Sequence, residues 1–157
     1  MDEKTLYVEG GLLFARLPGE PRGKGAGRAV RRGAHMGITT DAKTRQWMSE
    51  AVDRLEEAWS YGPLDRGVGV EIICVKARPK RLLRKKDPDD RLWCEGKPDA
   101  DNVSKIVCDS LTDAGVLRDD AKVVLLIVHT LYAARDEGPC TEIMLFDVQE
   151  FPPRRRM

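Results

Sequence analysis

The chain has 157 residues, of which 41% are hydrophobic and 34% charged, a composition typical of one globular domain with its own core. It has no apolar run of about 18 residues and no signal peptide, which excludes a membrane span and predicts a soluble, cytoplasmic protein. The net charge is only +1, which excludes a uniformly basic or acidic protein.

The charges are nevertheless unevenly distributed. Residues 15–45 carry eight Lys/Arg against two acids, and residues 76–97 carry nine against four. Residues 99–120 carry six Asp against one Lys and one Arg. Two basic blocks flanking an acidic one predict a protein that binds a polyanion through the basic blocks and cleaves it at a metal ion in the acidic block. Solvated charged faces remain the alternative.

The first third of the chain mixes strand, loop and helix signals. Residues 5–17 alternate loosely around Gly10-Gly11, which predicts two short strands or one strand with a bulge. Residues 18–37 hold six glycines, two prolines and five Lys/Arg, which predicts an irregular, mobile basic loop. Thr39-Thr40-Asp41 offers caps for a helix to about Ser60. We expect its apolar residues to be core: Trp47, Met48, Ala51, Val52, Leu55 and Trp59.

The remainder predicts three strands and a second helix. Val68–Val75 is β-branched and predicts a strand, and residues 78–96 predict a long basic loop. Trp93 in this loop either stacks on a base or packs to hold the loop in place, and we expect packing because it is the commoner role of an aromatic side chain. Apolar spacing from Asp101 predicts a helix that ends near Gly115. Residues 122–133 and 141–148 predict two strands that pair as a hairpin. His129 in the first of these is expected to be a packed residue, and His35 receives no assignment.

The predicted order is therefore β-β-α-β-α-β-β. This order predicts an α+β fold, with a mixed sheet and two main helices packed on one face of it. Residues 1–150 are expected to form one domain, and residues 151–157 a basic, disordered tail. The four cysteines are Cys74, Cys94, Cys108 and Cys140, which form no CxxC pair. They are expected to be reduced core residues, with no disulfide or zinc role.

The acidic block offers a candidate metal site. Asp99 and Asp101 stand at the mouth of the second predicted helix, and Asp101, Lys105 and Asp109 step by four along one face. Carboxylates that converge without histidine or cysteine suit a hard cation such as Mg²⁺ or Mn²⁺. The alternatives are a helix cap at Asp101, a turn at Asp119-Asp120 and an ion-pair cluster around Lys105.

Residues 97–105 (KPDADNVSK), then Asp109-Ser110-Leu111 and residues 115–124 (GVLRDDAKVV), resemble the RusA family of Holliday-junction resolvases. The earlier Gly19-Glu20-Pro21 with Lys24 and Arg28, and residues 38–45, resemble that family's N-terminal basic motif more loosely. The resemblance implies a homodimeric, Mg²⁺-dependent endonuclease that nicks four-way DNA junctions, common in phages and prophages. The loops at 18–37 and 78–96 are longer here than in compact members of the family.

The resemblance also implies roles for individual residues. Asp99, Asp101 and Asp120 fall on the essential acids that bind the metal, and Lys105 falls on the essential lysine. Asn102, Asp109 and Asp119 are expected to support the site, with Asp109 orienting Lys105. The expected DNA-binding residues are Lys24, Arg28, Lys43, Arg45, Lys80, Arg81, Arg84, Lys85, Lys86 and Lys97. The alternatives are a non-cleaving protein that binds branched DNA, and a nuclease that prefers other branched DNA.

Overall fold

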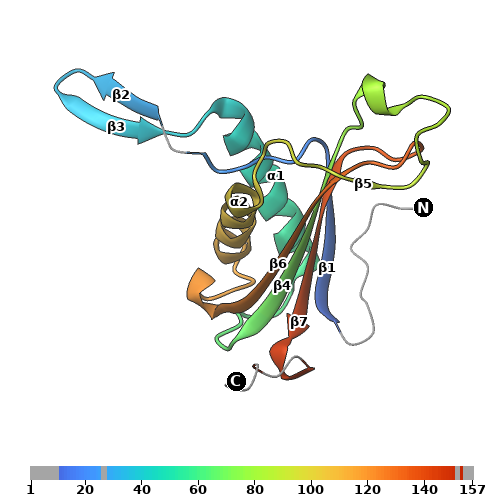
Figure 1. The fold of residues 1–157 in the computed structure, drawn as a ribbon. Coiled ribbons are helices and arrows are strands. Elements are labelled where there is room, and N and C mark those ends of the chain that lie inside the picture. The colour runs from blue at the N-terminus through green and yellow to red at the C-terminus, as the bar shows by residue number, and fades with distance from the viewer. Residues whose placement is uncertain (1–10, 26–27, 151–152, 154–157) are drawn as a thin grey trace.

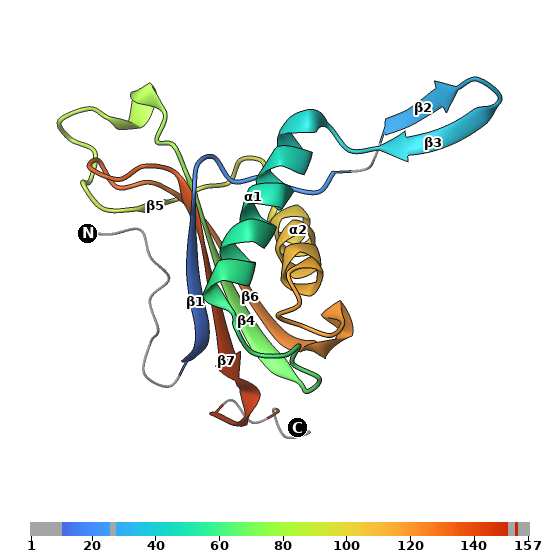
Figure 2. The same cartoon turned by 180° about the vertical axis from the view of Figure 1, so that it is seen from behind.

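The computed structural model describes residues 11–25, 28–150 and 153. A five-stranded mixed sheet carries two long helices on one face, and a separate two-stranded hairpin projects from the body (Figures 1 and 2). The predicted α+β domain is confirmed, whereas the predicted tail lies almost wholly outside the described residues. The elements are β1 (Gly11–Pro18), β2 (Arg28–Arg32), β3 (His35–Thr39), α1 (Ala42–Ala58), β4 (Val68–Lys76), η1 (Lys80–Leu82), β5 (Leu92–Trp93), α2 (Ala100–Asp113), η2 (Asp120–Lys122), β6 (Val123–Tyr132), β7 (Cys140–Asp147) and η3 (Val148–Glu150).

The strand order of the sheet is β1-β7-β4-β6-β5. β4 lies between the last two long strands, parallel to β6 and antiparallel to β7. The predicted hairpin of these two strands is therefore wrong, because β4 receives the backbone hydrogen bonds that each would have given the other. β5 covers only the end of β6, where Leu92 and Trp93 pair with Tyr132 and Leu131.

Both predicted helices are confirmed to within a few residues. Asp41 caps α1, and its Oδ1 accepts a hydrogen bond from the Thr44 backbone N–H at 3.0 Å. This bond and a second one from the Thr44 hydroxyl lower the pKa of Asp41. After α2, Gly115 adopts φ +67°, the left-handed conformation that glycine tolerates at the end of a helix.

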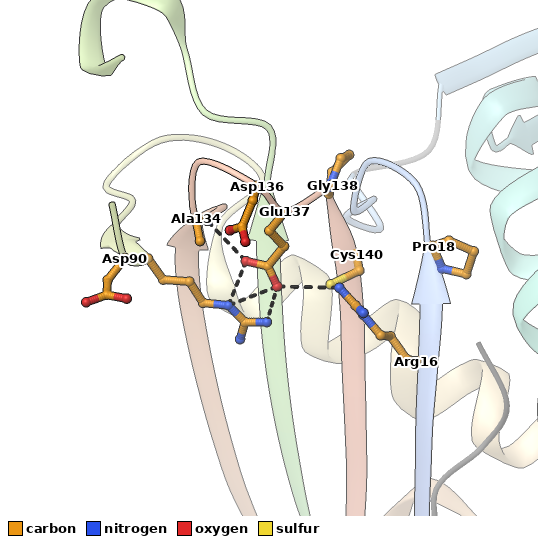
Figure 3. Close-up of a pocket in the computed structure, with 10 residues that line it drawn as sticks. Arg16, Pro18, Asp90, Ala134, Asp136, Glu137, Gly138 and Cys140 are labelled. Atoms are coloured by element: carbon orange, nitrogen blue, oxygen red, sulfur yellow. Dashed lines mark hydrogen bonds and ion pairs between the residues drawn. The ribbon is translucent and has the colours of Figure 1, made fainter. Parts of the chain in front are cut away.

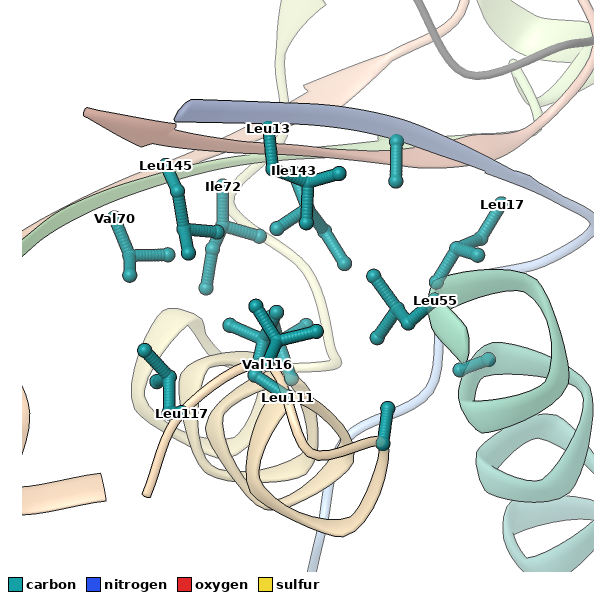
Figure 4. Close-up of a cluster of buried hydrophobic side chains, with 14 of the residues drawn as sticks. Leu13, Leu17, Leu55, Val70, Ile72, Leu111, Val116, Leu117, Ile143 and Leu145 are labelled. Carbon is teal, nitrogen blue, oxygen red and sulfur yellow. The ribbon is translucent and has the colours of Figure 1, made fainter. Parts of the chain in front are cut away.

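The core lies between the two helices and one face of the sheet (Figure 4). From α1 it takes Trp47, Ala51, Leu55 and Trp59, as their helical spacing predicts. Leu111 from α2 and Ile72 and Ile143 from the sheet are fully buried in the same cluster. All four cysteines are free, and Cys108 alone of them is partly exposed. Burial raises the pKa of the Cys74 thiol to about 12, which keeps it protonated.

Two further local predictions are wrong. Residues 28–39 form the β2–β3 hairpin, whose register runs from Arg28 opposite Thr39 to Arg32 opposite His35, where a mobile loop was expected. The Trp93 ring is 73% exposed, so it does not hold its loop by packing into the core. The first predicted strand begins at Gly11 in the described part of the chain, with a register shift before Leu13, and residues 1–10 lie outside it. No helix among the described residues is long and apolar enough to cross a membrane.

Candidate active site

Helix α2 presents a row of acids on the face that points away from the core. Its opposite face is buried through Val103, Ile106, Val107 and Leu111, which fixes the orientation of the helix. Asp101, Lys105, Asp109 and Asp113 then follow one another at four-residue steps along the outer face. The Lys105 ammonium lies 3.2 Å from Asp101 Oδ2, so the predicted polar ridge forms and its first acid carries a cation.

Asp99 occupies the N-cap position of α2 without using its side chain as a cap. Its backbone conformation is extended, and its carboxylate makes no capping hydrogen bond, in contrast to Asp41 at the start of α1. The cap proposed for Asp101 is not formed either, because that residue lies inside the first helical turn. Both carboxylates are exposed at the start of the helix. Neither carboxylate is therefore used to cap the helix.

Asp119 and Asp120 lie at the opposite end of α2. Asp119 Oδ1 accepts a hydrogen bond from the Ala121 backbone N–H at 2.8 Å, which is the turn role considered for it. Asp120 begins η2 and is exposed; within the described residues its carboxylate has no hydrogen bond or ion pair. A shallow cavity of about 380 Å³ lies between these residues and the second half of α2. Its lining is Lys24, Met48, Asp109, Thr112, Asp113, Asp119 and Asp120.

The predicted metal-binding acids are thus placed at two ends of one helix. Asp101 and Asp113 are twelve residues apart, which corresponds to about 18 Å along a helix. Asp120 shares a cavity with Asp113, whereas Asp99 and Asp101 do not line that cavity. Their donor atoms are all carboxylate oxygens, which suits a hard cation, and Asp99 and Asp120 have no competing cation among the described residues.

A different acidic group is tightly clustered. Within the described chain, the group of three potential ligand atoms that lie within 4.8 Å of one another comprises Glu137, Cys140 and Glu142. Two arginines already neutralise it: Arg91 Nη2 lies 2.8 Å from Glu142 Oε1, and Arg16 Nε lies 3.8 Å from the same oxygen. The hydrogen bond from Arg91 is also the main reason why the pKa of Glu137 is lowered.

Glu137 and Cys140 of this cluster line a cavity of about 790 Å³ between β1, β7 and the segment before β5 (Figure 3). Burial raises the pKa of the Cys140 thiol, although a hydrogen bond from Arg16 opposes the effect. A protonated thiol and two arginine-paired carboxylates make a poor metal site. We assign the cluster a structural role, which is to join the long basic loop to β7.

The basic segment before β2 docks directly on the acidic helix. The Lys24 backbone N–H donates to the Asn102 carbonyl at 2.9 Å, and the Lys24 ammonium pairs with Asp109. Gly23 permits this approach, since a Cβ on it would lie 2.8 Å from Pro98 Cβ and 2.9 Å from Asn102 Cβ. Asp109 therefore binds Lys24, and the expectation that Asp109 orients Lys105 is wrong in this structure.

The other expected DNA-binding residues lie on separate extensions. Lys43 and Arg45 are exposed in the first turn of α1, where Arg45 Nη1 donates to the Thr40 carbonyl at 2.7 Å. Arg28 lies on β2, and its side chain is outside the described part of the structure. The loop between β4 and β5 and the segment that follows carry the remainder, all exposed: Lys80, Arg81, Arg84, Lys85, Lys86 and Lys97.

Sequence reasoning missed the residues that hold this loop in shape. Arg78 Nε donates to the Ala133 carbonyl at 2.8 Å, and Arg135 Nη1 donates to the Leu83 carbonyl at 3.0 Å. Charge counting treats these arginines as surface charge, although their donors are used inside the protein. Lys76 was likewise missed beside the lead-in to α2, where a Cβ on Gly96 would lie 3.5 Å from its Nζ.

A row of acids on one helix, with the Lys24 segment bound to it and a second basic loop leading into it, is the charge arrangement expected of an enzyme that acts on nucleic acid. The family model for endodeoxyribonuclease RusA matches residues 18–145, which is most of the chain. The chain therefore belongs to the RusA family of endodeoxyribonucleases, whose general activity is the resolution of Holliday junctions. The resemblance seen in the sequence is confirmed. No curated protein matches the sequence.

Proposed function

We propose that this protein is a Mg²⁺-dependent resolvase that cuts four-way DNA junctions by paired, symmetric nicks. The observation that carries the proposal is the outer face of α2 and its surroundings. The carboxylates of Asp99 and Asp120 have no partner among the described residues, and Asp101 carries Lys105. The Lys24 segment binds the helix, and the second basic loop leads into it. Acids of this kind hold a hard cation, and the basic segments hold the phosphates around it.

Asp99 and Asp101 are proposed to hold one Mg²⁺ ion and Asp120 a second one, because Asp120 lies at the other end of α2, with Mn²⁺ as a substitute. A bound divalent ion of this type supplies an activated water and neutralises charge on the phosphate. Lys105 sits one helical turn after Asp101 and is proposed to move from that carboxylate to the phosphate being cut. Asn102 and Asp109 fix the position of the Lys24 segment, and Asp119 fixes the turn that presents Asp120.

DNA arms are proposed to bind along the exposed cations of the two long loops and of the first turn of α1. Contacts of this type recognise phosphates, so they read the shape of a junction and weaken as salt rises. A four-way junction has near two-fold symmetry. We therefore propose that a homodimer, with one active site in each subunit, matches the two strands to be cut.

The test is cleavage of an end-labelled four-way junction with Mg²⁺ and with chelator, for the wild type and for Asp101→Asn. We expect paired nicks that require both Mg²⁺ and Asp101, with junction binding in chelator unchanged by the substitution. Asp53→Asn is the matched control, because Asp53 is an exposed acid on α1 away from the site. A wild type that binds the junction but never cuts it with Mg²⁺ or Mn²⁺ supports the non-cleaving alternative. Faster cutting of a flap than of the four-way junction supports the alternative of a nuclease that prefers other branched DNA.

A further inference from the structure

Trp93 is an exposed aromatic ring held in a defined orientation. Of the three tryptophans, Trp47 and Trp59 are 7% and 9% exposed, whereas Trp93 is 73% exposed. Its backbone is held in β5 opposite Leu131 of β6. Its ring lies parallel to that of His129, with an interplanar angle of 11° and 6.1 Å between ring centroids. A tryptophan is seldom left this exposed unless its apolar face meets a partner.

The ring beneath the indole is itself anchored. His129 Nε2 and Glu71 Oε1 lie 2.9 Å apart, which joins the imidazole on β6 to the neighbouring strand β4. Both strands belong to the centre of the main sheet, so the imidazole has a rigid base. The indole therefore rests on a fixed aromatic neighbour and leaves much of its surface open to solvent. A flat aromatic surface with this preorganisation suits a flat aromatic ligand.

The charges around Trp93 indicate the chemical class of the aromatic ligand that would bind there. Trp93 ends the basic loop whose exposed cations, Lys80, Arg81, Arg84, Lys85 and Lys86, outnumber its exposed acids, Asp89, Asp90 and Glu95. The loop is not free to collapse, because Arg78 donates to the Leu82 and Asp89 carbonyls at 3.5 and 3.4 Å, and Arg135 to the Leu83 carbonyl at 3.0 Å. Trp93 and His129 lie on the face of the sheet that the helices do not cover, because Ile73, opposite His129, packs outside the core that Val128 contacts. A polyanion that carries aromatic bases satisfies the charge and the ring together.

We propose that Trp93, supported by His129, is a stacking site for an unpaired DNA base. This proposal rests on the proposed function, since it names the part of the substrate that the exposed ring binds. Bases at a branch point lose a stacking neighbour, and an aromatic side chain replaces that neighbour whatever the base. Trp93 is then a binding residue that selects branched over continuous DNA, and His129 is a positioning residue.

The first test measures binding in chelator, so that it does not depend on cleavage. The probes are a four-way junction, a continuous duplex of the same length and single-stranded oligothymidylate. One stacked base corresponds to roughly a five- to 150-fold change in affinity. We expect Trp93→Ala to lose affinity in that range for the junction and for oligothymidylate, with duplex binding unchanged. Trp93→Phe should recover most of it. Tyr61→Ala is the matched control, because Tyr61 is 65% exposed and packs edge-on against Trp59.

The second test uses the fluorescence of the protein itself. Because Trp47 and Trp59 are buried, acrylamide should quench mainly Trp93, and bound oligothymidylate should protect Trp93 and quench its emission by stacking. We expect this change to disappear in Trp93→Phe although the variant still binds. His129→Ala should reduce the quenching at saturating oligothymidylate, because the indole loses its fixed neighbour.

The outcomes separate the two proposals. Junction affinity of Trp93→Ala equal to that of the wild type overturns the stacking site and leaves the resolvase proposal intact. Tight, Trp93-dependent junction binding without cleavage supports the stacking site while the resolvase proposal fails. If Trp93→Ala changes the sedimentation of the protein and not its affinity for DNA, the ring contacts another copy of the chain and the stacking site is refuted. A wild type that binds no DNA refutes both.

Discussion

Replacing Arg91 by methionine removes the cation that pairs with both Glu137 and Glu142. Arg91 Nε lies 2.9 Å from Glu137 Oε2, and Arg91 Nη1 and Nη2 lie 3.1 and 2.8 Å from the two carboxylate oxygens of Glu142. The Arg91 side chain is 28% exposed, and each glutamate is 14% exposed. The variant keeps an unbranched apolar side chain in place of the arginine stem and leaves two largely buried carboxylates with Arg16 as their remaining ion-pair partner.

The size of the effect follows from that burial. Breaking a fully buried pair costs about 3–5 kcal/mol, whereas an exposed pair contributes about 0–1 kcal/mol. The Arg91 cluster lies between these limits, and Arg16 still lies 3.4 and 3.8 Å from the two glutamates. We therefore expect Arg91→Met to lower the free energy of unfolding by about 2–3 kcal/mol. Urea denaturation measures this. Arg66→Met is the matched control, because it breaks an exposed pair with Asp147 and should leave the urea midpoint unchanged.

The same variant predicts a dependence on pH. The hydrogen bond from Arg91 lowers the pKa of Glu137 below its ordinary value of 4.5. A carboxyl group whose pKa is lowered by folding stabilises the protein above its ordinary pKa, and this contribution is lost as the pH falls through the lowered value. The difference between wild type and Arg91→Met should be constant above about pH 6 and shrink below about pH 4. A difference under about 0.5 kcal/mol, or one that does not change with pH, would refute the structural role of the cluster.

Three further outcomes follow from closely packed or buried positions. Gly23→Ala should lower the melting temperature and slow junction cleavage, because its Cβ would lie 2.8 Å from Pro98 Cβ and push the Lys24 segment off α2; a wild-type melting curve would contradict this. Leu111→Ala, at a fully buried site, should lower the free energy of unfolding by about 2–5 kcal/mol in urea. Cys74 should resist a thiol reagent at pH 8 in the native protein and react after denaturation, as mass spectrometry would show, because burial raises its pKa to about 12.

Local sequence signals were sufficient where one element determines its own structure. The helix α1 combines a capping aspartate with an apolar face at helical spacing, and α2 combines such a face with Gly115 after its end. Strand pairing depends instead on which segments meet across the whole chain. Nothing within β6 or β7 indicates that β4 lies between them, so the adjacent strands were assigned to a hairpin.

The β2–β3 hairpin was missed for a different reason. Its strands carry arginines, Gly37 and Met36, which is 73% exposed, and none of the side chains that the structure describes in them is fully buried. Trp93 was mispredicted because an aromatic residue usually packs into the core. Here the indole stacks on His129 and stays 73% exposed. Features of this kind arise from tertiary contacts, which a periodicity analysis does not detect.

In the candidate site, too, local spacing predicted some features and tertiary contacts determined the others. Helical spacing placed Asp101, Lys105 and Asp109 on one face, as observed, but it assigned the wrong cation to Asp109. The partner is Lys24, which is 85 residues away in the sequence and reaches α2 because Gly23 fits between Pro98 and Asn102. A pairing over that distance is fixed by the fold and not by the spacing of either segment.

The contact between Lys24 and α2 also joins the two parts of the sequence that resemble the family. The basic N-terminal segment and the acidic helix form one continuous surface, held by the backbone hydrogen bond from Lys24 to Asn102 and by the Lys24–Asp109 ion pair. Lys24 therefore neutralises the middle of the acidic row. Within the described residues, the acids without an ion pair lie at its ends, Asp99 at one and Asp113, Asp119 and Asp120 at the other. A cation that binds to this surface should therefore compete less with lysine at the ends of α2 than at its centre.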